Sequence, residues 1–514
     1  MTAICSLHIA VTTPGEPMTT SAPEAAAPAP AHRFPPLLVI VVLGFGSLAG
    51  ALMQSLVIPI QSEMPELLHT DAGNASWAIT ATLLAAAVTM PVTGRLADMV
   101  GKKRVLVASA AVLVVGSLVA ALSSSVVPFL TGRALQGVAM GYIPVAISFV
   151  REVAPPARRA GAVAAISATL GVGGALGLPL AAWIAQDYSW HGLFWLSSAL
   201  ALVVLVLTVV VVPGIHDEHP AHLDLLGIAG LAVGLSAVLV AVSKGSEWGW
   251  SAGRTLAMLV GGVVVLLGWA WYQLRHEDPI VDLRTTARRP ILFTNLAAVL
   301  IGFGMMAQSI VVPQLLEMPE ATGYGLGQSI LEAGLWMAPA GLMMLLFAPV
   351  SSGLINHVGA RVTLSVGAVV LAVGYVVALF LMSAPWQLMV ASLVASAGVG
   401  IGYAAMPTLV LDNAPESEAG SSVGVNTLMR SVGTTVAGAV MAAVLTSDTQ
   451  ALGAGLPTVP TEHAFQVCFV VGAVAALAGA LVALLVPRRG SEVPATTPST
   501  AEPAPAPAGA LPQG

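Results

Sequence analysis

Charged residues are scarce in this chain of 514 residues, and their scarcity argues against a water-soluble protein. Asp, Glu, Lys and Arg together make up 9% of the sequence, whereas hydrophobic residues make up 57%. A soluble globular chain carries about 25% charged residues, which cover its surface. Most of the folded surface of this chain would lack such a covering, so we expect lipid to surround it.

Cysteines and ATP-binding signatures are few or missing as well. Cys5 and Cys468, the two cysteines, lie far apart in the sequence and indicate neither a disulfide framework nor a metal site. No GxxxxGK[ST] segment occurs, so direct use of ATP is not expected. A run of His216, His219 and His222 leaves a metal site open, with a solvated loop as the simpler alternative. We expect no enzyme activity, no cofactor, no resident metal and no nucleic-acid partner.

Both ends of the chain are rich in Ala and Pro and are predicted to be disordered. Residues 1–34 and residues 488–514 hold too few apolar side chains to offset the entropy lost on ordering. Pro14 interrupts the N-terminal stretch and no basic region precedes an apolar run, so we do not expect this stretch to be a signal peptide. Met18 is an alternative start of the chain.

Long apolar segments dominate the remaining sequence. A membrane-spanning helix needs about 20 mostly apolar residues. Fourteen segments qualify, approximately 37–60, 75–94, 105–123, 126–149, 160–185, 191–212, 223–243, 254–274, 291–316, 327–350, 361–383, 386–411, 420–445 and 464–486. The alternation of a lipid-facing β-barrel is absent, so the spans are predicted to be helices. The expected fold class is an all-α polytopic membrane protein.

Lysine and arginine predict the orientation of these spans. With both termini in the cytoplasm, Lys244 and Arg254 fall outside, and Arg133 and Arg430 fall within spans. All the other basic residues of the 19 then lie on the cytoplasmic side. This bias follows the positive-inside rule and supports an even number of spans.

The two halves of the sequence share landmarks in the same order. QSLVIP at 54–59 returns as QSIVVP at 308–313, and GRLADMVGKKR at 94–104 returns as SGLINHVGAR at 352–361. The pattern predicts six helices (35–213), two inserted helices with their connections (214–290) and six more helices (291–487). Such repeats are typical of transporters whose substrate site lies between two pseudo-symmetric bundles.

The repeated glutamines, Gln54 and Gln308, are polar groups at membrane depth. A buried amide without partners is costly there, so both are expected to face the interior. Two interpretations are open: they line a central cavity and bind substrate, or they bond to neighbouring helices and hold the fold together. Pro59 and Pro313 are interpreted as helix-end or kink formers.

The segment after the second span carries the most specific motif, formed by Gly94, Asp98, Gly101, Lys102, Lys103 and Arg104. With it, the chain resembles the major facilitator superfamily, and specifically its fourteen-helix drug:proton antiporter subfamily, over approximately residues 37–487. In that family this loop latches the cytoplasmic ends together while the pathway is open outward. The resemblance places Asp98 near the start of the thirteenth span, around 419–424. A plain positive-inside anchor is the alternative.

Three spans carry further motifs that resemble those of the family. The fourth span holds Arg133, Gln136 and Gly137, the fifth holds Gly171, Gly174, Gly177 and Pro179, and the thirteenth holds Asn426 and Arg430. The resemblance implies proton coupling for the arginine of the fourth span, with a snorkelling side chain as the alternative. It implies a conformational role for the glycines, with close helix packing as the alternative. For Arg430 a functional role and a structural ion pair are both open.

A titratable carboxylate for proton coupling is not evident in the first span. Close relatives often place an aspartate where this sequence has Gly50. Glu332, one or two turns into the tenth span, is the strongest candidate within any span. Either it is desolvated and binds a proton or a cationic drug, or it is a solvated residue of the outer headgroup zone.

The resemblance implies a proton-driven exporter of small lipophilic or cationic compounds that works by alternating access. We expect a monomer in the plasma membrane, with both termini in the cytoplasm and the proton as coupling ion. The alternatives are an uncoupled facilitator or an exporter of a single metabolite, and a membrane sensor that transports nothing.

Overall fold

The structure is a computed structural model that describes residues 34–58, 60–61, 63–215, 222–451 and 458–487. Within this part of the chain, fourteen helical segments are long and apolar enough to cross a membrane, which confirms the predicted all-α polytopic fold. Residues 1–33 of the expected N-terminal tail, the whole expected C-terminal tail (488–514), the histidines at 216 and 219, and Pro59 lie outside the described residues.

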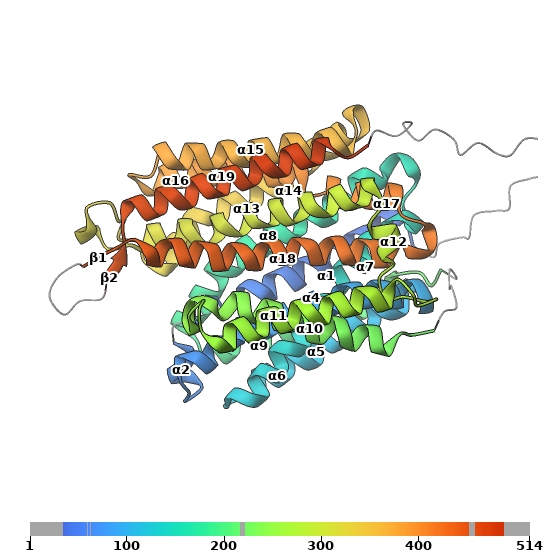
Figure 1. The fold of residues 1–514 in the computed structure, drawn as a ribbon, viewed down its shortest axis with the longest axis horizontal. Coiled ribbons are helices and arrows are strands. Elements are labelled where there is room, and N and C mark those ends of the chain that lie inside the picture. The colour runs from blue at the N-terminus through green and yellow to red at the C-terminus, as the bar shows by residue number, and fades with distance from the viewer. Residues whose placement is uncertain (1–33, 59, 62, 216–221, 452–457, 488–514) are drawn as a thin grey trace, which may run out of the picture.

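The helices fall into two sets of six spans with an inserted pair between them (Figure 1). The first set is α1 Pro36–Ser55, α2 Met64–Leu67, α3 Ala72–Ala75, α4 Trp77–Val100, α5 Lys102–Leu122, α6 Val126–Ala139, α7 Tyr142–Val153, η1 Pro156–Arg158, α8 Arg159–Asp187 and α9 His191–Val211. The inserted helices are α10 Leu225–Trp248 and α11 Gly253–Gln273, and the short α12 Leu283–Thr286 follows them. The second set is α13 Arg289–Glu317, η2 Glu320–Thr322, α14 Ile330–Val358, α15 Ala360–Phe380, α16 Pro385–Gly402, α17 Ala405–Asn413, η3 Glu416–Glu418, α18 Ala419–Ser447 and α19 Glu462–Leu484. An antiparallel hairpin of β1 Thr449–Ala451 and β2 Thr458–Pro460 connects α18 to α19.

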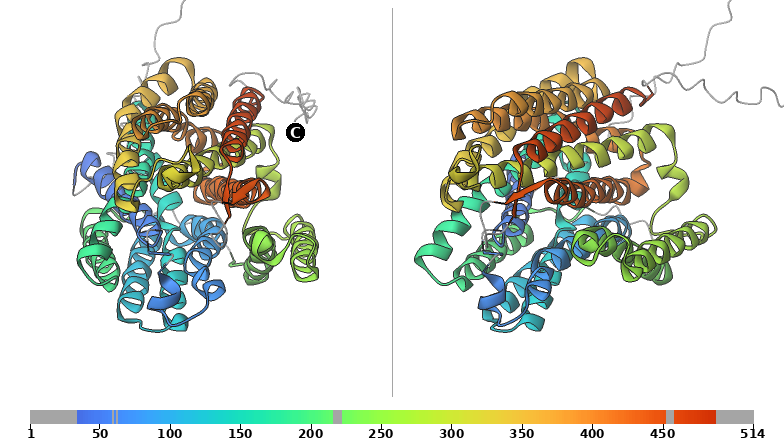
Figure 2. Two further views of the ribbon diagram at one scale, coloured as in Figure 1. Left: turned by 90° about the vertical axis from the view of Figure 1, so that its left-hand side faces the viewer. Right: turned by 60° about the vertical axis from the view of Figure 1, so that its left-hand side comes forward.

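The two sets pack as equivalent bundles. In the first, α5 packs against α6 and α9, and α1 packs against α8; in the second, α15 packs against α16 and α19, and α13 packs against α18. The bundles meet along two seams, where α4 lies against α18 and α8 lies against α14. The inserted pair stands outside both bundles, with α10 against α4 and α18 (Figure 2).

Each bundle has one broken span at the same place. The fourth span is interrupted between α6 and α7, and the twelfth is interrupted between α16 and α17. Pro144 and Pro407 follow these breaks at a distance of one helical turn. A proline lacks the N–H that would bond to the carbonyl four residues earlier, and its ring clashes with that carbonyl. The affected carbonyls belong to Met140 and Tyr403, which lie at the breaks. This symmetric kink was not anticipated from the sequence.

The motif after the second span is not a loop, which corrects the sequence-based interpretation. The helix α4 runs through Gly94 and Asp98 to Val100, and α5 begins at Lys102. Only Gly101 lies outside a helix, with a φ of 93° that favours glycine. Its counterpart in the second bundle, Gly359, has a φ of 86°. Gly101 therefore makes the turn, and Gly94 must serve another purpose.

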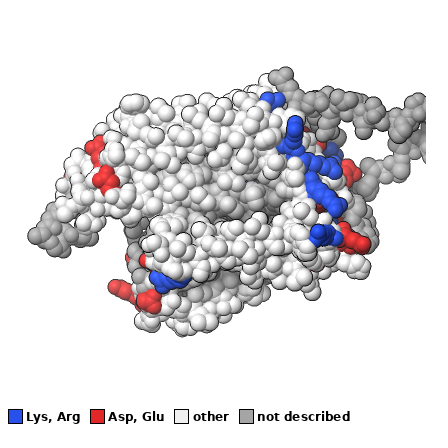
Figure 3. Space-filling view, viewed as in Figure 1, with Lys and Arg blue, Asp and Glu red and all other residues white. Residues whose placement is uncertain are grey.

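Charged side chains gather at the two ends of the molecule (Figure 3). The larger group of blue lysines and arginines lies at the end that carries α12 and α17, which we call the basic end, and a smaller blue patch lies at the opposite end. We call the opposite end, which carries β1 and β2, the hairpin end. The flank between the two ends shows no charge on this face, as expected of a surface that meets lipid.

Candidate functional site

Asp98 joins the two bundles at the basic end. Its side chain is 2% exposed, and its two carboxylate oxygens accept hydrogen bonds from the backbone N–H groups of Gly420 and Ser421, both at 2.9 Å. These groups belong to the first turn of α18, where free N–H groups and the helix dipole favour a negative charge. The ammonium of Lys102 lies 3.8 Å from the same carboxylate. The carboxylate thus meets the start of α18, which is the contact that the family resemblance implied.

Gly94 permits this contact. A Cβ atom added to Gly94 would lie 2.2 Å from the carbonyl oxygen of Gly420, which is backbone and cannot move aside. The helices α4 and α18 can therefore approach closely only with glycine at this position. Asn356, the counterpart of Asp98 in the second bundle, is exposed. The Asp98 contact therefore has no equivalent on the α8–α14 seam.

The remaining basic residues of the motif lie at the periphery of this contact. Lys102 is buried and also contacts Glu152 of α7. Lys103 donates to the carbonyl of Val209 at 3.1 Å, and the exposed Arg104 donates to the carbonyl of Val100 at 3.0 Å. Only Lys102 therefore reinforces the Asp98 contact directly.

A second contact closes the basic end beside the first. One nitrogen of the Arg151 guanidinium donates to the carbonyls of Leu411 at 3.1 Å and Ala414 at 3.4 Å, and the other lies 3.3 Å from the Glu416 carboxylate. Because Arg151 belongs to the first bundle and its partners to the second, this end is closed in the structure. This contact could not be predicted from the sequence, because Arg151 is one of many basic residues on the side that the positive-inside rule assigns to the cytoplasm.

Arg133 is enclosed within the first bundle. Its side chain is 1% exposed and donates to the carbonyls of Ala78 at 2.9 Å and Met53 at 3.4 Å, and to Gln136 Oε1 at 2.6 Å. Gln136 donates onward to Ser117 at 2.9 Å. One guanidinium nitrogen, Nη2, has no partner within the described part of the chain. The residue is therefore buried in the protein, which differs from a snorkelling side chain at the boundary.

Gly137 brings the helices around Arg133 together. A Cβ added to it would lie 2.3 Å from the carbonyl oxygen of Thr82 on α4. The Thr82 hydroxyl in turn donates to the carbonyl of Arg133 at 3.0 Å. The close contact of α4 and α6 thus depends on Gly137, and it holds the chain that carries Arg133 in place.

The glycines of α8 face three different environments. Gly171 faces Met344 of α14, Gly177 faces Ser55 of α1, and Gly174 has no atom within 4 Å of an added Cβ. Pro179 lies inside the helix, and its backbone passes near Gly334 of α14. The every-third-residue spacing therefore does not form one continuous groove. The tightest backbone contact belongs instead to Gly173, which the motif does not include.

We expect Gly173→Ala to destabilise the protein and Gly174→Ala to leave its stability unchanged. A Cβ at Gly173 would lie 2.6 Å from the carbonyl oxygen of Leu48 on α1, whereas a Cβ at Gly174 meets open space. Overpacking of this kind costs about 1–3 kcal/mol. Thermal unfolding of the purified variants measures the difference. Equal melting temperatures for the two variants would contradict the packing described here.

The repeated glutamines occupy different surroundings. Gln308 is buried and donates to the carbonyl of Ser392 on α16 at 3.4 Å, which is a contact between neighbouring helices of one bundle. Gln54 is half-buried and makes no hydrogen bond to the described residues. Pro313 lies inside α13, which does not end there. The two glutamines therefore differ: Gln308 bonds to a neighbouring helix, as the structural interpretation predicts, whereas Gln54 has no such bond to the described residues.

The carboxylate of Glu332 is exposed at the start of α14. Its Oε2 accepts hydrogen bonds from the backbone N–H and the hydroxyl of Ser329, both at 2.9 Å, and closes a capping box. Such a cap stabilises the first turn of a helix. This arrangement corresponds to the solvated alternative and not to a desolvated coupling group.

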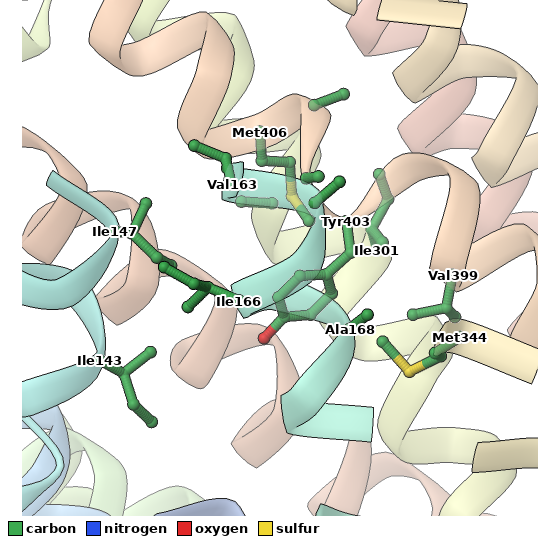
Figure 4. Packing of buried hydrophobic residues seen from close by; sticks show 14 of the residues in the cluster. Ile143, Ile147, Val163, Ile166, Ala168, Ile301, Met344, Val399, Tyr403 and Met406 are labelled. Atoms are coloured by element: carbon green, nitrogen blue, oxygen red, sulfur yellow. The ribbon is translucent and has the colours of Figure 1, made fainter. Parts of the chain in front are cut away.

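Arg430 and Asn426 lie one turn apart on α18. The Asn426 amide donates to Asn295 Oδ1 of α13 at 2.9 Å, and the Asn295 nitrogen is buried without an acceptor in the described residues. The Arg430 guanidinium lies over the ring of Tyr403, at 4.4 Å from its centroid. Figure 4 shows the buried Tyr403 among apolar side chains of both bundles. Asn295 and Tyr403 were missed because isolated polar residues in apolar spans carry no motif.

The described residues offer no metal centre. No group of three or more His, Cys, Asp or Glu side chains in them is arranged to hold an ion. His222 can be placed, and its backbone N–H donates to Asp278 at 3.1 Å.

Comparisons with known proteins agree with this architecture. The description "Major Facilitator Superfamily" belongs to a family model that matches residues 43–438 and again residues 294–511. The uncharacterized MFS-type transporter Rv1877 of Mycobacterium tuberculosis (strain ATCC 25618 / H37Rv) is 29% identical over 324 residues, which are 63% of this chain and 46% of the relative. The chain thus spans about half the length of that relative.

A second relative is matched over more of its length. The multidrug transporter protein MdtP of Bacillus subtilis (strain 168) is 23% identical over 416 residues, which are 79% of this chain and 74% of the relative. Among solved structures, the human organic anion transporter MFSD10 is similar with a TM-score of 0.63 at 17% identity, covering 88% of this chain and 100% of that chain. At that identity the likeness shows a shared fold alone.

Proposed function

Because the chain belongs to the major facilitator superfamily, we propose that it is a secondary active exporter of small, largely apolar compounds, driven by proton entry. Two six-helix bundles that meet along two seams are suited to alternating access, in which one pathway opens to each side in turn. The printed name of one relative, a multidrug transporter protein, supports export of varied compounds. The positive-inside rule supports a plasma-membrane protein whose basic end faces the cytoplasm, together with both termini.

The buried contact of Asp98 with α18 is the observation that carries this proposal. It joins the bundles through hydrogen bonds that a small displacement of α18 would break. A permanent contact between the bundles would not need a buried charge, because apolar side chains can replace buried ionic groups without loss of stability. The structure then represents a state whose cytoplasmic end is closed. Substrate from the cytoplasm must wait until Asp98 leaves the start of α18 and the Arg151 contact also opens.

Transport in liposomes tests the proposal. Purified protein is reconstituted with an imposed pH gradient, and movement of a lipophilic dye is followed together with internal pH. Dye movement that depends on the gradient and is accompanied by proton flux is the expected result. Dye movement that ignores the gradient would replace the exporter by an uncoupled facilitator. No movement of any dye would favour a membrane sensor.

An uncoupled facilitator is the second candidate, because one observation favours it. Every Asp and Glu in the described part of the chain lies within two turns of a helix end or in a connection. None is therefore held at mid-membrane depth, where a coupling carboxylate would be desolvated and reachable from both sides.

We expect Glu332→Gln to retain gradient-driven transport, with proton flux unchanged. The carboxylate is exposed and bonds only to Ser329, and glutamine also suits this position of a capping box. Its melting temperature should match that of the unchanged protein. Loss of proton flux in a variant that still moves dye would assign coupling to Glu332 after all.

A further inference from the structure

We propose that the space beside Arg430 binds the negatively charged group of an amphipathic organic anion, an aromatic carboxylate or sulfonate. This assignment names the substrate class of the exporter and rests on the proposed function for its role in transport. The site comprises Arg430 of α18, Tyr403 at the break between α16 and α17, and the Asn426–Asn295 amide pair one turn below.

Arg430 lies near the middle of the membrane. It follows Ala419, the first residue of α18, by eleven positions. At about 1.5 Å per residue this is roughly 17 Å along the axis, about half of a hydrocarbon core of about 30 Å. A cation at this depth is costly without a partner and therefore marks a functional position by default.

No carboxylate of the described residues balances the charge of Arg430. The described acids lie near helix ends or in connections, and no ion pair involves Arg430. Its guanidinium donates no hydrogen bond within the described part of the chain. Its one described partner is the face of the Tyr403 ring, at 4.4 Å. Stacking on a ring uses the face of the guanidinium and leaves its N–H edges available for a carboxylate.

The second arginine of the spans cannot serve this purpose. Arg133 is 1% exposed and donates to two carbonyls and to Gln136 inside one bundle. Arg430 is only half-buried, so accessible space reaches its side chain. Its aliphatic stem passes Gly302 of α13, where an added Cβ would lie 2.9 Å from it. Glycine at that position allows the long side chain to extend toward Tyr403.

The repeat indicates that this position faces the junction of the bundles. The starts of α8 and α18 align at the Ala-Gly pairs 160–161 and 419–420. In this alignment of the repeat, Arg430 and Gly171 occupy equivalent positions. Gly171 faces Met344 of the other bundle. Tyr403 lies at the same junction, among Ile143, Ile166 and Met344 (Figure 4).

A second unpartnered donor belongs to Asn295, whose partner Asn426 lies one turn before Arg430 on α18. The side chain of Asn295 is 4% exposed, and its amide nitrogen has no acceptor among the described residues. Its oxygen is already occupied by Asn426, which precedes Arg430 by one turn. The amide pair that holds this spare donor and the spare positive charge of Arg430 thus lie one turn apart along α18, and apolar side chains surround Tyr403 beside them. This combination suits an anionic head on an apolar body, whereas a cationic compound would meet repulsion without any compensating carboxylate.

Three probes of one shape test the charge preference. Radiolabelled 2-naphthoate, 2-naphthamide and 2-naphthylmethylammonium are anionic, neutral and cationic, and their equilibrium binding is measured on full-length protein in lipid nanodiscs. We expect 2-naphthoate to bind about 10- to 100-fold more tightly than 2-naphthamide, as one charge-assisted contact provides. Arg430→Gln should reduce this preference to within about twofold, while Arg430→Lys should keep part of it.

Arg254→Gln is the matched control, because Arg254 also stacks on an aromatic ring, that of Trp248 at 4.7 Å, but at the start of α11. It should leave the preference for 2-naphthoate unchanged. A melting curve checks that each variant is folded, and Tyr403→Phe, which keeps the ring, should retain binding. Preference for the cation or the neutral probe, no binding of any probe, or a preference that survives Arg430→Gln would each overturn the proposal.

Transport of the same probes distinguishes failure of the anion site from failure of the export function. If liposomes export 2-naphthamide or the cation along a pH gradient but not 2-naphthoate, the export function stands and the anion site fails. If 2-naphthoate binds through Arg430 and no probe crosses the membrane, the anion site stands and the export function fails.

Discussion

Replacing Asp98 with asparagine is expected to open the basic end of the molecule and to reduce export about 10- to 100-fold. The carboxylate accepts two backbone hydrogen bonds from the first turn of α18, at 2.9 Å each. A hydrogen bond to a charged group contributes about 1.5–3 kcal/mol, and the helix dipole adds about 0.3–1 kcal/mol. Asparagine keeps one acceptor oxygen and loses the charge. A loss of about 1.4–2.8 kcal/mol shifts a two-state equilibrium by the stated factor.

Distances between spin labels measure this opening. Labels at Ala157→Cys and Ser417→Cys, in a chain with Cys5→Ser and Cys468→Ala, report on both bundles at the basic end. We expect the Asp98→Asn chain to populate longer distances than its parent. Glu416→Gln is the control, because the pair of Glu416 with Arg151 is exposed and such pairs contribute at most about 1 kcal/mol. An unchanged distance distribution together with full export would rule out a latch at Asp98.

The number of spans and their class could be predicted because both depend on composition averaged over long windows. Runs of about 20 apolar residues have one stable solution in lipid, and basic residues fix which ends lie together. The contact of Asp98 with the start of α18 was expected from the family resemblance, because the residue itself left a helix N-terminus and a basic side chain open as partners, and the structure shows both. Repeated landmarks predicted the two bundles, which the packing of the helices reproduces.

Positions that depend on which way a side chain points could not be predicted. Gly173 and Gly174 are neighbours, yet one meets the backbone of α1 and the other meets open space, because successive residues of a helix point about 100° apart. Gln54 and Gln308 share a repeat, yet only Gln308 bonds to a neighbouring helix. Glu332 lies one or two turns into the predicted tenth span, yet in the structure it closes a capping box at the start of α14. The spacing of residues in the sequence predicts which of them share a helix face. The neighbouring helix, which the spacing does not reveal, determines what each side chain contacts.

The environments of the two arginines within the spans could not be predicted from the sequence either, and they suggest different roles for the two residues. In the sequence, Arg133 and Arg430 look alike, since each is a lone cation in an apolar run. In the structure, the carbonyls of Ala78 and Met53 enclose one of them, while the other stacks on Tyr403 and remains accessible. The two therefore call for different experiments, of binding for Arg430 and of stability against transport for Arg133.

Arg133→Met is expected to stabilise the protein while it abolishes transport. A buried charge without a counter-charge costs several kcal/mol of desolvation, and replacing buried ionic groups with apolar ones of similar volume often stabilises proteins by about 1–4 kcal/mol. Arg133 is 1% exposed, lacks a carboxylate partner among the described residues and leaves its Nη2 without an acceptor. Methionine fills much of the same space and removes that cost. A residue kept at the expense of stability is kept for function, so we expect export to fall at least about tenfold.

Thermal unfolding and transport, measured on the same preparation, separate this expectation from its rivals. Arg275→Met is the control, because Arg275 stacks on Trp271 at 4.0 Å near the end of α11 and its side chain is exposed, so its loss should change neither quantity. A lower melting temperature in Arg133→Met would make the three hydrogen bonds of Arg133 a structural joint of α1, α4 and α6. Unchanged transport in a folded Arg133→Met variant would remove Arg133 from the transport cycle altogether. Only a higher melting temperature combined with lost transport assigns this buried cation to the movement of protons or substrate. In that case the contacts of Arg133 do not offset the free energy of its desolvation, so the residue does not serve stability.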